Sequence, residues 1–124
     1  MKGEIIMSDT KKNISEENKN EVRPSVGKYV HKFSKPFVFE EKTYEQLTFD
    51  FSTLTGKDAM SIENELQAKG QTVLIPEYHH GYLLAFAARA CVEKIPSDAY
   101  EYMPINDYNA IRKAARNFMM GQDF

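Results

Sequence analysis

The adjacent histidines His79 and His80 are the first residues whose chemistry deserves testing, because an imidazole nitrogen is a common metal ligand. Neighbouring residues on a helix point about 100° apart, so this pair cannot chelate one ion as an i, i+4 pair can. His31 is distant in sequence, and no cysteine or carboxylate completes a known metal-binding spacing. We therefore expect no metal site and interpret the pair as polar residues in the first turn of a helix.

Nucleophilic and acid–base chemistry has equally little support. Cys91 is the single cysteine, it lies in an apolar run, and no histidine stands at a recognisable motif spacing from it. Asp98, Glu101 and Asp107 lie near expected helix starts, where capping and the helix dipole explain carboxylates. We expect no catalytic and no cofactor-binding residues, and so no enzyme. A chain without an internal disulfide fits a reducing cytoplasm.

Arg112, Lys113 and Arg116 form a basic edge on the last expected helix. With the short helix expected before it, this edge has the pattern of a helix-turn-helix recognition element. Three charges are also an ordinary solvated face. The formal net charge of −2 and the pI near 5.9 argue against non-specific binding to nucleic acid.

Length and composition limit the organisation of the 124 residues to one domain with a tail. Residues 1–26 are polar and are expected to be a disordered tail. Residues 27–120 are expected to form a single α+β domain, and 121–124 a C-terminal tail. No apolar run reaches the roughly 18 residues that a membrane-spanning helix needs, so we expect a cytoplasmic protein.

A β-hairpin is expected at about 28–52. Leu47, Phe49 and Phe51 alternate with polar residues, which is the period of a half-buried strand. Pro36 cannot donate to a ladder, so it predicts an edge position or a bulge. Because two strands alone are marginally stable, this hairpin must pack on the helices or on another chain.

Helices are expected at about 56–69, 77–93, 97–103 and 106–120. Thr55 can cap the first, Asp58 suits its positive end, and Gly70 stops it. The second is apolar almost all round from Tyr82 to Val92, so it should be the central helix of the core. Hairpin and helices together predict an α+β fold.

Five short motifs follow one another through this domain: a Pro-Phe extended segment, the strand pattern Tyr44-x-x-Leu47-x-Phe49, the segment Leu54-Thr-Gly-Lys-Asp58, the helix Leu83-Leu84-Ala85 with Ala87-Ala88-Arg89-Ala90, and a final helix with Asp107-Tyr-x-x-Ile111 and Asn117-Phe118. Their order and spacing resemble the phage tail assembly chaperone family, which occurs in tailed phages, prophages and tailocin clusters. The resemblance covers about residues 28–120, and the long polar N-terminal tail departs from the family pattern.

The resemblance implies a cytoplasmic, non-catalytic protein of tail morphogenesis that is absent from finished particles. It implies that the chain binds the long helical tape measure protein, keeps it soluble and helps to recruit tail tube subunits. A longer form made by translational frameshifting commonly accompanies such proteins. A groove on the chain would cover the apolar stripe of a tape measure helix, and a homo-oligomer would add avidity. No binding to nucleic acid or membrane is implied. The alternative is a small DNA-binding or regulatory protein of a prophage.

Residue type alone indicates which side chains could contact a partner. Arg89 interrupts the apolar helix, so it is either an edge residue with a packed stem or a partner contact. Aromatic residues on the hairpin and helices are the other candidates, since interfaces are enriched in them. The partner-binding candidates are Phe37, Phe39, Tyr82, Arg89, Tyr102 and Phe118.

Overall fold

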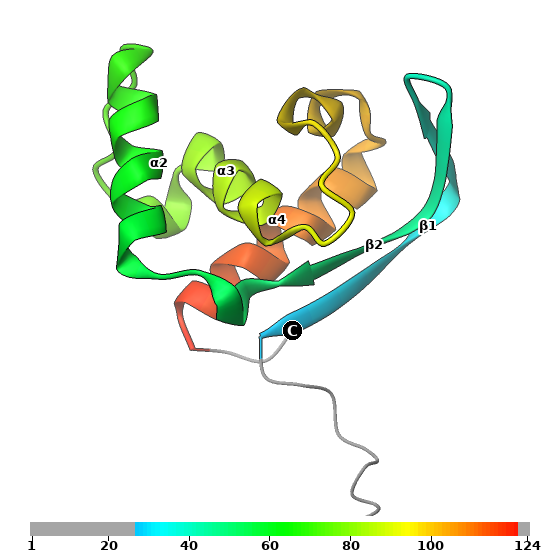
Figure 1. The fold of residues 1–124 in the computed structure, drawn as a ribbon, viewed down its shortest axis with the longest axis horizontal. Coiled ribbons are helices and arrows are strands. Elements are labelled where there is room, and N and C mark those ends of the chain that lie inside the picture. The colour runs from blue at the N-terminus through cyan, green and yellow to red at the C-terminus, as the bar shows by residue number, and fades with distance from the viewer. Residues whose placement is uncertain (1–26, 122–124) are drawn as a thin grey trace, which may run out of the picture.

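The computed structural model describes residues 27–121, and it has the expected α+β fold. Two antiparallel strands, β1 (Lys28–Phe39) and β2 (Lys42–Asp50), form a hairpin along one side of the helices (Figure 1). The expected tail at 1–26 and residues 122–124 lie outside the described residues. No helix within the described part of the chain is long and apolar enough to cross a membrane.

The hairpin turns at Glu40 and Glu41, which both have positive φ angles of 49° and 70°. Two consecutive left-handed residues are typical of the tight turns whose twist matches that of paired strands. The register is broken between the pairs Lys32–Gln46 and Phe37–Tyr44, so residues 33–36 bulge opposite Glu45. Pro36 lies in this bulge, as its missing N–H predicts.

Strand β2 continues through the 3-10 turn η2 (Phe51–Thr53) into helix α2 (Gly56–Ala68). Thr55 and Asp58 form a capping box, in which the Thr55 N–H donates to Asp58 Oδ2 at 2.9 Å. Gly70 ends the helix with a φ of +82°, and the following N–H of Gln71 donates to the Leu66 carbonyl at 2.9 Å. The predicted bounds of this helix are confirmed to within a residue.

Helix α3 (His80–Ala90) is shorter at both ends than the predicted range of 77–93. The separate 3-10 turn η3 (Pro76–Tyr78) precedes it, because His79 is an extended N-cap whose Nδ1 accepts from the Tyr82 N–H at 3.1 Å. At the other end Cys91 leaves the helix to form a bridge with Phe49, and the Val92 N–H donates to the Thr48 carbonyl at 2.8 Å. Sheet pairing therefore ends the helix.

Helix α3 is the central helix of the core, as its apolar sequence predicts. It packs against both α2 and α4 (Ile105–Met119), and the 3-10 helix η4 (Ser97–Tyr102) covers part of it (Figure 1). Phe51 joins the hairpin to the helices, because its ring stacks on those of Phe86 and Phe118 at 5.6 and 5.5 Å between centroids. The largest fully buried side chains are Tyr100, Phe49, Phe51, Leu47, Ile62, Leu83, Ile111 and Cys91.

Candidate functional site

The two adjacent histidines have different local roles. His79 caps α3 through Nδ1, and its ring stacks on that of His80 with centroids 5.6 Å apart. His31 is buried elsewhere, on β1. Residues 27–121 contain no group of three or more histidine, cysteine or acidic side chains that could hold a metal ion.

Cys91 is completely buried, and its thiol contacts Glu93 Oε1 at 3.7 Å. Tyr100 is also completely buried, and burial together with the nearby Cys91 raises the pKa of its phenol. Neither group is accessible to a substrate. Their surroundings are those of core residues.

Three side chains that the sequence analysis did not connect form a hydrogen-bonded chain between β1 and α4. His31 Nε2 lies 2.8 Å from Asp107 Oδ1, and His31 Nδ1 lies 2.9 Å from the Tyr29 hydroxyl. Burial, and then the charge of Asp107, raise the pKa of Tyr29, so its phenol keeps its proton at neutral pH. An activated nucleophile would need the opposite shift, and we interpret the chain of bonds as a structural link.

Asp107 lies in the first turn of α4, as its position near an expected helix start predicts, but it is only 4% exposed because it contacts His31. The two residues are 76 positions apart in the sequence. No local spacing in the sequence can signal a contact of that range.

The basic edge on α4 is held by aromatic rings. The Arg112 guanidinium lies over the ring of Tyr108, 5.6 Å from its centroid, and that of Arg116 lies over the ring of Tyr78 at 5.9 Å. The element before α4 is a six-residue 3-10 helix, and α4 packs along α3. This arrangement differs from a helix-turn-helix, in which two α-helices cross and the second is free to enter a groove of DNA.

The five aromatic partner-binding candidates occupy three kinds of environment. Phe37 and Tyr82 are 7% and 3% exposed, so they offer almost no surface. Phe118 is half-buried on Phe51. Phe39 packs on Tyr102 with centroids 6.0 Å apart, and Tyr102 is 69% exposed. Those two alone combine to form an aromatic surface.

Arg89, the sixth candidate, is occupied by contacts within the fold. One guanidinium nitrogen donates to Asp58 Oδ1 and the other to Glu65 Oε2, each at 3.0 Å. These two bonds fasten α3 to α2. The stem of Arg89 still lines a groove.

The outer edge of strand β1 is poorly suited to pairing with a second chain. Strand β1 carries Lys28, Lys32 and Lys35 at exposed positions, and Pro36 lies in its bulge. Lysines, proline and bulges on an edge strand are the features that prevent sheet extension. A homo-oligomer built through this edge is therefore disfavoured.

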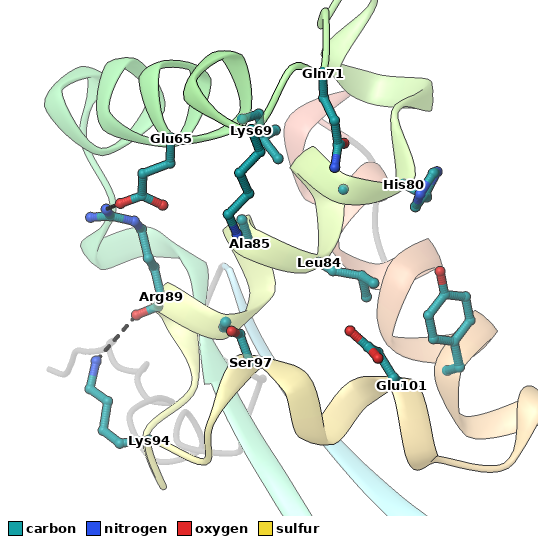
Figure 2. Close-up of a pocket in the computed structure, with 14 residues that line it drawn as sticks. Glu65, Lys69, Gln71, His80, Leu84, Ala85, Arg89, Lys94, Ser97 and Glu101 are labelled. Carbon is teal, nitrogen blue, oxygen red and sulfur yellow. Dashed lines mark hydrogen bonds and ion pairs between the residues drawn. The ribbon is translucent and has the colours of Figure 1, made fainter.

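The groove to which Arg89 contributes runs over α3, with α2 on one side and η4 and the start of α4 on the other (Figure 2). It encloses about 710 Å³. Its floor consists of small or apolar residues of α3 that are half-buried: Gly81, Leu84, Ala85 and Ala88. The bulky residues of the same helix, such as Leu83 and Phe86, face the core.

The walls of this groove, which we call the α3 groove, are polar and charged. Glu65 lies on α2 and Lys69 directly after its last residue, and Ser97 and Glu101 lie opposite on η4 (Figure 2). Tyr108 and His80 border one end. One pattern in the sequence indicates this groove: the small residues Gly81, Ala85 and Ala88 recur at helical spacing on one face of α3, a face they share with Leu84.

Comparisons with protein-family models, curated proteins and solved structures found no match to this chain.

Proposed function

We propose that the protein is a phage tail assembly chaperone, which binds the tape measure protein and keeps it soluble while the tail forms. The observation that carries the proposal is the α3 groove, an open hollow with a floor of small or apolar residues between polar and charged walls. The order of motifs from the Pro-Phe segment to Asn117-Phe118 supports the family. The proposal places the protein in the cytoplasm of the host bacterium.

The shape of the groove suits a helix better than a small substrate. Small side chains on α3 let a second helix approach closely, because the distance between packed helices depends on the side chains at the contact. Helix-in-groove recognition places an apolar stripe against such a floor. A tape measure protein, being long and helical, has many such stripes to protect before the tail tube encloses it.

Recruitment of tail tube subunits is the second half of the proposed function. A longer frameshifted form of the chain would contribute to it. The aromatic surface of Phe39 and Tyr102 lies on the hairpin and η4, on elements other than the floor of the α3 groove. It is a candidate contact for this second partner.

The test is co-expression of the full chain with the tape measure protein of the same gene cluster. We expect the tape measure protein to move from the insoluble to the soluble fraction and to co-purify with the chain. An antibody to the chain should detect it in a phage-producing lysate, with a minor longer product, and not in purified particles. A single short product retained in particles would instead indicate a structural tail component.

The alternative function, a small prophage regulator that binds DNA, depends on Arg112, Lys113 and Arg116. A regulator should bind DNA with an affinity that falls steeply as salt rises. The proposed chaperone should show no binding to duplex DNA at physiological salt in the same titration.

A further inference from the structure

Charge is distributed unevenly around the α3 groove. Arg89 pairs with both Glu65 and Asp58, and this cluster of one cation and two acids has a net charge of −1. Lys69 has no ion-pair partner among the residues described, and the Lys94 ammonium donates to the Arg89 carbonyl at 3.3 Å (Figure 2). Glu101 is the remaining acid of the lining. Outside the Arg89 cluster the lining therefore carries two cations, Lys69 and Lys94, against one acid, although the whole chain is acidic.

The positive charge continues along α4. Arg112 lies over Tyr108, which borders the groove, and Arg116 lies one turn further on over Tyr78. Neither guanidinium has an acidic partner within ion-pair distance among residues 27–121. A guanidinium stacked on an aromatic ring keeps its N–H groups at the edge, where they can bind a carboxylate.

From this charge we infer that the α3 groove takes an amphipathic helix whose apolar stripe is flanked by acidic residues. The stripe packs on Gly81, Ala85 and Ala88, and carboxylates on its two flanks meet Lys69 on one wall and Arg112 beyond the other. The inference rests on the proposed function, because both use this groove. It adds the chemistry by which a binding segment is chosen from a long helical partner.

Electrostatic complementarity of this kind selects partners more than it adds affinity, since an opposed charge pattern is rejected. The exposed positions of the groove make the effect sensitive to salt. A segment with basic flanks should therefore bind weakly even when its apolar stripe is identical.

The first experiment titrates the full chain with two synthetic helical peptides by fluorescence anisotropy. Both carry the same leucine and alanine stripe, with glutamate flanks in one and lysine flanks in the other. We expect the acidic peptide to bind at least about tenfold more tightly, with a preference that shrinks as salt is raised. Equal affinities, or a preference for the basic peptide, would overturn the inference.

Two variants locate the binding. Ala85→Leu fills the floor and should abolish binding of the acidic peptide, whereas Ala68→Leu, the same change at an exposed position of α2 outside the groove lining, should not. The double change Lys69→Glu with Arg112→Glu should reverse the preference toward the basic peptide. Lys57→Glu, at an exposed position of α2 outside the lining, is its control. If circular dichroism shows that the Ala85→Leu variant is unfolded, the charge-reversal variant alone tests whether the peptide binds in the groove.

The outcomes separate this inference from the proposed function. If the tape measure protein binds and neither groove variant weakens it, the inference fails and the function stands. If the acidic peptide binds in the groove and the tape measure protein does not bind, the function fails and the inference stands. If the chain self-associates and Ala85→Leu abolishes this association, a second copy occupies the groove, and the inference is also overturned.

Discussion

His31 Nε2 and Asp107 Oδ1 lie 2.8 Å apart in the interior, and this contact joins the first strand to the last helix. Both side chains are more than nine-tenths buried. Because two-stranded sheets are marginal alone, a polar link of this kind helps to fix how the hairpin lies on the helices.

Removing one partner of this pair should therefore destabilise the fold. We expect Asp107→Ala to lower the free energy of unfolding by about 3 kcal/mol, because it leaves a buried imidazole without its partner. Asp107→Asn keeps a hydrogen-bonding side chain and should cost about 1 kcal/mol. Urea unfolding followed by circular dichroism measures both. Asp98→Asn, at an exposed acid, is the control, and equal stabilities for all variants would contradict the structural role.

The ionisation of Asp58 leads to a prediction about how the stability of the fold depends on pH. Its pKa is lowered chiefly by the hydrogen bond from the Thr55 backbone N–H and further by Arg89. A carboxylate whose pKa is lowered in the folded state stabilises the fold above its unfolded pKa, and this contribution is lost as pH falls through the folded value.

Wild type should therefore be more stable than Asp58→Asn at pH 7. The difference should shrink as the pH is lowered below about 4, the ordinary range of an aspartate pKa. Thermal unfolding at a series of pH values tests this, with Glu45→Gln as a control at an exposed site. If the stability difference between wild type and Asp58→Asn grows as the pH is lowered, the predicted direction of the pH dependence is wrong.

Two glycines should respond oppositely to the same substitution. Gly27 has a φ of +86°, and a Cβ there would meet Phe118 Cε1 at 2.9 Å and the Ser52 nitrogen at 3.2 Å. We expect Gly27→Ala to cost about 1–3 kcal/mol through backbone strain and crowding. Gly56, at the start of α2, has nothing within 4 Å of such a Cβ, so Gly56→Ala should be neutral or stabilising by up to about 1 kcal/mol. Equal effects in denaturant titrations would contradict this account.

The parts of the fold that the sequence predicted are those governed by local rules. Alternation at Leu47 and Phe49 located β2, and Thr55, Asp58 and Gly70 located the ends of α2. The bounds of α3 were wrong because its ends are set by His79 capping and by pairing of Cys91 with the sheet. An apolar run indicates which residues are buried, but it does not indicate at which residue a helix ends.

The candidate site was harder to predict, because residue type does not separate core from surface. Tyr82 and Tyr102 are the same type of residue, but their exposed fractions are 3% and 69%. The α3 groove is made of small side chains from one helix and charged side chains from its neighbours. Such a surface exists only after helices distant in sequence are placed together.

The edge of β1 supplies the last prediction. Its exposed lysines Lys32 and Lys35 oppose pairing with a second chain, because a β-strand added there would have to approach their charges. Replacing both by valine raises β propensity and removes the charge. In sedimentation velocity at matched concentrations, we expect the sedimentation coefficient of the double variant to rise with concentration because it self-associates. That of wild type should not change over the same range. Lys57→Val, on α2 away from the sheet, should behave as wild type. If the double variant sediments like wild type at every concentration, the lysines do not protect this edge, and Pro36 with its bulge must do so instead.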